Sequence, residues 1–229
     1  MADFPFDIVG FDLDGTLLDT QGDLANALNF ALSLEGREAI PVAEVRDLIG
    51  GGARKMLVRA LELTGGIVEQ ARLDALHGEL VDWYEAHIAA ETRLFPGGEA
   101  MIEGLLQRGA RLAVVTNKLE RLAVKLMGEL GLSPHFFTVI GGDTLGPGRA
   151  KPQPDLLHLM VERAGGGTPA FVGDTTYDTG AARAAGMPCV AVSFGFCDLP
   201  PGDLGADTVI DHYDELIPAL AALGTSPLR

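Results

Sequence analysis

Two acidic side chains stand two residues apart directly after an apolar run near the start of the chain. Asp12 and Asp14 follow Ile8–Phe11 and precede Gly15. Residues two apart in a strand point the same way, but a strand that breaks at glycine lets the second carboxylate turn across a pocket. One carboxylate can then attack phosphorus while the other handles the proton of the leaving group. The spacing therefore predicts covalent catalysis through an aspartyl-phosphate.

Polar residues also follow two later apolar runs. Thr116-Asn117-Lys118 comes after Leu112–Val115, and the segment Asp174–Asp178 comes closely after Ala170–Val172. Ligands of an open parallel sheet bind beyond the carboxyl ends of its strands. We therefore expect these residues to share one rim with the first two carboxylates.

The predicted rim holds more negative than positive charge. Its four carboxylates would repel one another, so a divalent cation is the natural neutraliser. Because the ligands would all be oxygens and a substrate phosphate can complete the shell, Mg²⁺ is favoured. Lys151 begins a helix nearby, in Lys151-Pro152-Gln153-Pro154. Thr116 and Lys151 would hold the phosphoryl oxygens, the hydroxyl by donating and the ammonium by offsetting charge.

The elements that must position these residues show a regular alternation. Short, nearly continuous apolar runs are typical of strands buried on both faces, and helical stripes such as Leu122, Leu126 and Leu130 lie between them. This alternation predicts an α/β fold with a doubly wound, Rossmann-like parallel sheet. The predicted strands are Ile8–Phe11, Leu112–Val115, Phe137–Ile140, Ala170–Val172, Cys189–Val192 and Thr208–Ile210.

The segment between the first two predicted strands breaks the alternation, because its pattern is helical throughout. The sequence therefore predicts an inserted all-helical cap over residues 20–91, on a core formed by residues 1–19 and 92–229. Hinges are expected near Leu17–Thr20 and Arg93–Gly97. A lid of this kind would exclude water and recognise the leaving group.

The composition limits the classes of partner that the protein can bind. The 229 residues carry 17 Lys and Arg against 32 Asp and Glu, a net charge of −15. Such a surface repels phosphate backbones and anionic lipid heads, so we expect no nucleic-acid and no membrane partner. Two cysteines make no disulfide framework in a chain this long, and no run approaches the ~20 apolar residues of a membrane span. We expect a cytoplasmic monomer or homodimer.

Taken in order, these motifs resemble the four motifs of the haloacid-dehalogenase superfamily of phosphohydrolases. They are Asp12-Leu13-Asp14-Gly15-Thr16, Thr116-Asn117, Lys151-Pro152 and Gly173-Asp174 with Asp178. The resemblance implies that Asp12 is the nucleophile and Asp14 the general acid and base. It implies phosphate binding by Thr116, Asn117 and Lys151, and Mg²⁺ ligation by Asp12, the backbone carbonyl of Asp14, and Asp174, with Asp178 supporting the waters of the metal.

Other segments resemble the bacterial phosphoglycolate phosphatases of this superfamily. They include the segment that begins Asp23-Leu24-Ala25, Val114–Lys118, Gly141-Gly142-Asp143 and Ala184–Pro188. The resemblance implies a small phosphorylated metabolite as substrate, most simply 2-phosphoglycolate. A phosphatase for a sugar phosphate or a nucleoside monophosphate is the alternative, and a catalytically silent binding protein on the same fold is a second one.

The cap loop departs from that pattern and makes a candidate substrate contact. Gly51 stands where the branch has Asn, and Arg54-Lys55 brings two cations just after it. We expect the backbone N–H groups of Gly51 and Gly52, with Arg54, to face the substrate carboxylate.

Purely structural interpretations also stay open for some of these residues. Gly50–Gly52 would also suit a plain helix–helix turn, and Asp178 an N-cap of a helix over Thr179–Ala185. Trp83 and Tyr84 are expected in the cap core. The histidines show no metal-ligand spacing, and none is a credible catalytic base.

Overall fold

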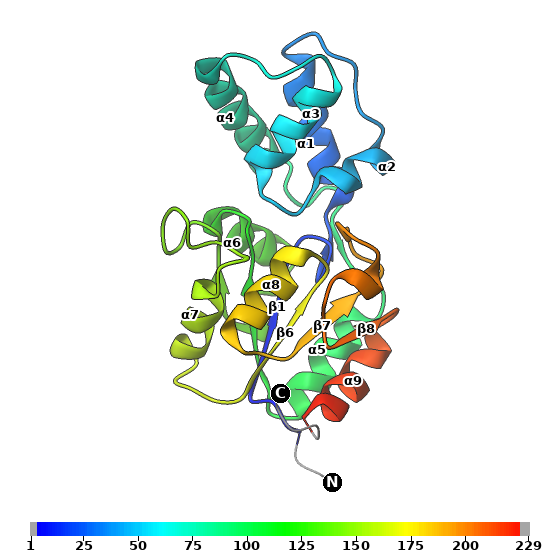
Figure 1. Ribbon diagram of the computed structural model, residues 1–229, viewed down its shortest axis with the longest axis vertical. Coiled ribbons are helices and arrows are strands. Elements are labelled where there is room, and N and C mark those ends of the chain that lie inside the picture. Colours follow the sequence, from blue (N-terminus) through cyan, green and yellow to red (C-terminus); the bar gives the residue numbers. More distant parts are fainter. Residues whose placement is uncertain (1–3, 225–229) are drawn as a thin grey trace.

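The computed structural model describes residues 4–224 of the chain. Its centre is a six-stranded parallel sheet with the order β5-β4-β1-β6-β7-β8 (Figure 1). The strands are β1 (Ile8–Phe11), β4 (Arg111–Val115), β5 (Phe136–Ile140), β6 (Pro169–Gly173), β7 (Cys189–Val192) and β8 (Thr208–Ile210). Each predicted strand is present, and the predicted fold class is confirmed.

Helices cover both faces of this sheet. Side chains of β1 alternate between two apolar clusters, with Val9 and Phe11 in one and Ile8 in the other. Beside the sheet, the first cluster includes residues of α5 (Gly98–Gln107), α6 (Glu120–Glu129) and α9 (Leu216–Leu223), and it continues into the helices of residues 21–86. The second takes them from α7 (Asp155–Arg163) and α8 (Thr176–Ala185). The sheet is therefore doubly wound. None of the helices that the structure describes is long and apolar enough to cross a membrane.

A helical layer stands beyond the carboxyl ends of the strands (Figure 1). The chain leaves the core in β2 (Leu18–Asp19) and returns in β3 (Arg93–Leu94), which pair antiparallel. These two strands were not predicted, because two residues carry no periodic signal. Between them lie α1 (Gln21–Ser33), α2 (Val42–Val45), a 3₁₀ turn at Arg46–Leu48, α3 (Ala53–Leu63) and α4 (Gln70–Ala86). The division into a core of residues 1–19 and 92–229 and a cap of residues 20–91 stays a proposal.

The inner faces of α1 and α4 hold this layer together. Leu28 and Leu32 of α1 and Leu76 and Leu80 of α4 are almost fully buried. They recur at helical spacing, and burying each such side chain contributes about 1.5–3 kcal/mol relative to exposure. These side chains belong to the same apolar cluster as Val9 and Phe11 of β1, so the layer packs onto the sheet through one continuous core.

A buried carboxylate fastens the two connecting segments. Asp23 in the first turn of α1 is 1% exposed and accepts hydrogen bonds from the backbone N–H groups of Glu91 and Thr92, both at 3.0 Å. The hydroxyl of Thr92 donates to it as well, at 2.7 Å. Hydrogen bonds to an ionised group are the stronger kind, so Asp23 fixes where the cap meets the core.

Candidate active site

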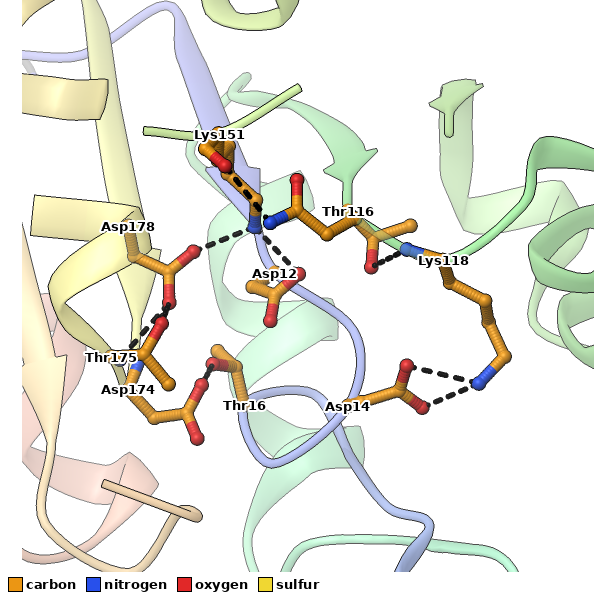
Figure 2. Close-up of polar contacts among 10 residues, drawn as sticks. Asp12, Asp14, Thr16, Thr116, Lys118, Lys151, Asp174, Thr175 and Asp178 are labelled. Atoms are coloured by element: carbon orange, nitrogen blue, oxygen red, sulfur yellow. Dashed lines mark hydrogen bonds and ion pairs between the residues drawn. The ribbon is translucent and has the colours of Figure 1, made fainter. Parts of the chain in front are cut away.

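The residues predicted to carry the chemistry meet at the carboxyl ends of the central strands (Figure 2), and residues of the cap line the same cleft. Asp12 follows β1, Thr116 follows β4 and Asp174 follows β6, and these three strands are neighbours in the sheet. Lys151 comes from the loop between β5 and α7. Parallel pairing alone brings these strand ends to one edge, which is why a linear sequence could indicate the site.

Lys151 joins two of the carboxylates. Its Nζ lies 2.7 Å from Oδ1 of Asp12 and 2.6 Å from Oδ1 of Asp178, and the residue is 3% exposed. Burial alone would lower the pKa of Lys151, but the charges of Asp12 and Asp178 outweigh it and raise this pKa above its usual value. The ammonium therefore stays charged beside Asp12.

Asp178 holds Lys151 in place from the first turn of α8. Its Oδ2 accepts from the N–H and the hydroxyl of Thr175, at 3.0 and 2.6 Å. Thr175 is the N-cap and Asp178 lies three residues further on, so the pair forms a capping box. The alternative interpretation as the N-cap of a helix over Thr179–Ala185 was wrong, because the helix begins at Thr176. Asp178 serves the helix start and Lys151 together.

Asp174 is clamped between two loops. Its Oδ1 accepts from the hydroxyl of Thr16 at 2.8 Å, and its Oδ2 accepts from the backbone N–H of Phe196 at 2.7 Å. A Cβ on Gly15 would lie 2.3 Å from Oδ2, and one on Gly195 would lie 2.4 Å from the Cβ of Asp174. Only glycine lets both loops approach this closely. Both oxygens of Asp174 are therefore fixed by the backbone around them.

Three of the carboxylates form a group that suits a cation. Oxygen atoms of Asp12, Asp174 and Asp178 lie within 4.8 Å of one another, and all three residues are buried. Burial raises the pKa of Asp12 to about 6, with Lys151 lowering it and Asp178 raising it. Burial, and then the charges of Asp178 and Asp12, raise the pKa of Asp174 well above its usual value. A bound cation would relieve this repulsion, so the donor set fits a divalent metal.

The carboxylate of Asp14 faces the other way. Figure 2 shows it turned toward Lys118, whose Nζ donates to its two oxygens at 2.7 and 2.9 Å. Burial alone would lower the pKa of Lys118, but the charge of Asp14 opposes this most strongly and the pKa lies above its usual value. Asp12 and Asp14 therefore have different cationic partners, an arrangement that suits two carboxylates with different tasks.

A cleft of about 260 Å³ opens between this rim and the cap. The core lines it with Asp12, Asp14 and Thr116–Lys118, and the cap lines it with Ile49–Arg54 and Met56. One face of α4 completes the wall with His77, Leu80, Val81 and Tyr84, spaced as one helical stripe. The site is therefore built from both layers.

The cap loop Gly50–Gly52 lies directly over the rim. A Cβ on Gly50 would lie 3.4 Å from Cγ2 of Thr175, and one on Gly52 would lie 3.6 Å from the carbonyl oxygen of Asn117. Gly50 and Gly52 have φ of 117° and 88°, which favours glycine. The loop lines the cleft, and its predicted contact with a substrate stays a prediction.

The two cations after this loop already have partners within the protein. Arg54 lines the cleft but donates to Asp74 at 2.6 Å, in a pair whose side chains are 42% and 57% exposed. The ammonium of Lys55 stands 4.9 Å from the ring centroid of Tyr177 in the core. The predicted role of Arg54 as a carboxylate clamp stays a prediction.

Polar contacts hold the cap over the core. Arg46 of the cap donates to the backbone carbonyls of Phe194 and Gly195. On the opposite side Lys125 donates to the carbonyl of Glu85 at 2.7 Å. Because Gly195 also packs on Asp174, the first of these contacts joins the cap to the acidic group.

Three residues of the site were not assigned from the sequence. Lys118 was part of the quoted Thr116-Asn117-Lys118 motif, and its place after two phosphate-binding candidates was the available signal. Tyr84 is buried as expected, at 2% exposed, but its side chain also lines the cleft, and its buried hydroxyl has no hydrogen-bond partner among residues 4–224. His77 also lines the cleft, and a single histidine on a helix gives no sequence signal for that.

Comparison with known proteins identifies the family. The sequence model of the haloacid dehalogenase-like hydrolases matches residues 9–192, most of the chain. The chain belongs to the haloacid dehalogenase-like hydrolase family. It is 39% identical over 214 residues to a phosphoglycolate phosphatase of Agrobacterium fabrum, covering 92% of this chain and 90% of that protein. It is 40% identical over 220 residues to one of Caulobacter vibrioides, covering 95% and 92%.

Solved structures give the same result. A crystal structure described as a predicted phosphoglycolate phosphatase of Haemophilus somnus matches with a TM-score of 0.87 at 26% identity, covering 94% of this chain and 98% of that one. One from Lactobacillus delbrueckii matches at 0.85 and 28% identity, covering 93% and 98%. The predicted superfamily and the predicted enzyme class, a phosphoric monoester hydrolase, are confirmed.

Proposed function

We propose that this hydrolase converts 2-phosphoglycolate to glycolate and phosphate through an aspartyl-phosphate on Asp12. The observation that carries the proposal is the pair of aspartates with separate cationic partners, both facing one small cleft under the cap. Asp12 is held by Lys151 and Asp14 by Lys118. The relatives that cover nearly the whole chain are named phosphoglycolate phosphatases, which supports this substrate.

The first half of the reaction is attack on phosphorus. An oxygen of Asp12 forms the new bond, and the ester bond to glycolate breaks. Lys151, 2.7 Å from Asp12, stands where it can offset the charge of the phosphoryl oxygens. The hydroxyl oxygen of Thr116 accepts from the backbone N–H of Lys118 at 3.2 Å, so its own proton is free to be donated to a phosphoryl oxygen.

Asn117 ties two parts of this phosphate pocket together. Its side-chain amide donates to the carbonyl of Lys151 at 3.1 Å. The contact fixes the loop that carries the ammonium against the end of β4. Asn117 therefore acts on phosphate binding by holding Lys151 and Thr116 at a constant separation.

The second carboxylate handles protons. Asp14 protonates the leaving oxygen of glycolate and then takes a proton from the water that opens the aspartyl-phosphate, returning Asp12 to its carboxylate form. The bidentate contact with Lys118 keeps Asp14 out of the acidic group, so that it does not compete with Asp12 for phosphorus.

The acidic group would hold Mg²⁺. Its ligands are the carboxylates of Asp12 and Asp174 and the backbone carbonyl of Asp14, with Asp178 beside them. The ion, when bound, supplies positive charge that neutralises these carboxylates and the phosphoryl oxygens. The hydrogen bonds of Asp174 to Thr16 and Phe196 orient its carboxylate for this task.

A phosphate-release screen tests the proposal. The panel contains 2-phosphoglycolate, a hexose phosphate and a nucleoside monophosphate, with Asp12→Asn as the inactive control. We expect the highest kcat/KM for 2-phosphoglycolate and no turnover by the variant. A tenfold preference for a sugar phosphate or a nucleotide would move the substrate to the alternative class. Release from no substrate at all would favour a silent binding protein.

A further inference from the structure

We propose that Lys118 recognises the carboxylate of the substrate, with the hydroxyl of Tyr84 as its second contact, and that this pair sets the specificity of the enzyme. The proposal rests on the proposed function, because it assumes a leaving group that carries a carboxylate. It places the clamp in the core of the protein, next to the general acid, and not at Arg54 on the cap.

The shortness of glycolate requires the clamp to be near Asp14. A single methylene carbon separates the leaving oxygen of 2-phosphoglycolate from its carboxylate, so the two groups are roughly two bond lengths apart. Any cation that binds the carboxylate must therefore lie beside the residue that protonates the oxygen. The Nζ of Lys118 is 2.7 and 2.9 Å from the two oxygens of Asp14 and meets this requirement.

Lys118 also has donor capacity for a second anion. An ammonium group carries three N–H donors, and Asp14 takes two of them. The third can bind a substrate carboxylate while Asp14 stays in place. Because Asp14 and Lys118 border the same cleft as Asp12, one small molecule can reach all three.

Burial favours Lys118 over Arg54 as the clamp. In the described part of the chain, these are the lysine and arginine side chains that border the cleft, and they are 6% and 42% exposed. Charges attract more strongly away from water, and exposed pairs contribute little. His77 is no substitute, because burial and then the charge of Arg54 lower its pKa and favour the neutral ring.

Tyr84 supplies the second contact and makes recognition depend on the cap. Its ring centroid lies 4.6 Å from the Nζ of Lys118, so α4 covers this cation from above. The buried hydroxyl has no hydrogen-bond partner among residues 4–224. A buried hydroxyl without a partner is costly, and because Tyr84 lines the cleft, a small turn of its side chain would let the hydroxyl donate to a substrate carboxylate.

The experiment compares two substrates of equal length. 2-Hydroxyethyl phosphate replaces the carboxylate of 2-phosphoglycolate with a neutral hydroxymethyl group and keeps the ester. Both are assayed with the Mg²⁺-loaded wild type and with Lys118→Met, Lys118→Arg, Tyr84→Phe and Arg54→Ala. Thermal melting of each variant reports whether it folds.

We expect Lys118→Met to lower kcat/KM for 2-phosphoglycolate roughly 10²-fold more than for the neutral ester, because a buried charged contact is lost. Lys118→Arg should restore part of the discrimination, and Tyr84→Phe should reduce it by about tenfold or less. Arg54→Ala, the matched cation on the cap side of the cleft, should leave the ratio of the two substrates unchanged. If Lys118→Met does not fold, the ratios of Lys118→Arg and Tyr84→Phe decide.

Two results would overturn the proposal, and they are distinguishable. If the wild type prefers 2-phosphoglycolate but Lys118→Met and Tyr84→Phe harm both substrates equally, Lys118 acts only through Asp14 and the clamp is elsewhere. If the wild type does not prefer 2-phosphoglycolate over the neutral ester, the proposed substrate is wrong and the clamp is wrong with it.

Discussion

Replacement of Gly195 by alanine should disable the acidic group without changing any of its carboxylates. A Cβ at this position would lie 2.4 Å from the Cβ of Asp174 and 2.4 Å from the backbone carbonyl oxygen of Gly15. Both neighbours belong to loops that converge on the site, so neither can turn away as the end of a flexible side chain would. The backbone of one or both loops must therefore move.

The size of that movement sets the expected loss. Ordinary contact begins near 3.4 Å, so Asp174 or Gly15 must shift by about 1 Å, and a misplacement of about 1 Å in an active site can cost ~10²-fold in rate. Overpacking of this kind typically costs about 1–3 kcal/mol of folding free energy. For a protein of this size each kcal/mol lowers Tm by about 2–4 °C.

The assay is kcat/KM for 2-phosphoglycolate as a function of Mg²⁺ concentration, with Tm measured on the same samples. We expect Gly195→Ala to lose on the order of 10²-fold in kcat/KM, to need more Mg²⁺, and to melt several degrees lower. Gly202→Ala is the control, because a Cβ there meets nothing within 4 Å. Activity of Gly195→Ala within threefold of wild type would refute the argument that these loops hold Asp174 in position.

Three further predictions follow from the same contacts. Asp14→Asn should lose ~10²–10⁴-fold on 2-phosphoglycolate and much less on an aryl phosphate whose leaving group needs no proton; equal losses would make Asp14 structural. Chelation should abolish phosphate release and Mg²⁺ should restore it, with Ca²⁺ a poor replacement because it prefers more ligands and looser geometry; full activity in excess chelator would remove the metal from the account. Tyr213→Phe deletes the O–H that donates to the carbonyl of Thr16 at 2.6 Å, so urea denaturation should give a free energy of unfolding lower by about 1–3 kcal/mol, whereas an unchanged value would show that the carbonyl finds another donor.

The sheet could be predicted from the sequence because its strands are continuous local signals. Ile8–Phe11, Cys189–Val192 and Thr208–Ile210 begin and end in the structure where the apolar runs do. The rim followed from this, since parallel strands bring their carboxyl ends together. The short strands β2 and β3 could not be predicted, because their pairing depends on where the cap returns the chain.

The ion pairs between charged residues could not be predicted from the sequence, for a different reason. Asp14 and Lys118 lie 104 residues apart, and no local pattern distinguishes this pairing from others. Arg54 gave a plausible local signal beside a glycine loop, yet the structure pairs it with Asp74, one helix further on. Which face of α4 looks into the cleft, and so the position of Tyr84 and His77, depends on how α4 packs against α1. Such choices depend on three-dimensional packing.

The most direct test of the central claim is the site of covalent phosphorylation during turnover. The wild type is mixed with excess 2-phosphoglycolate and Mg²⁺ and quenched in acid within the first turnover. The protein is then digested, and the masses of its peptides are measured by mass spectrometry. We predict a phosphoryl group on Asp12, and a burst of glycolate before phosphate whenever hydrolysis of the intermediate is the slow step. A phosphoryl group on another residue would contradict the account. So would a burst of glycolate before phosphate while Asp12 stays unmodified.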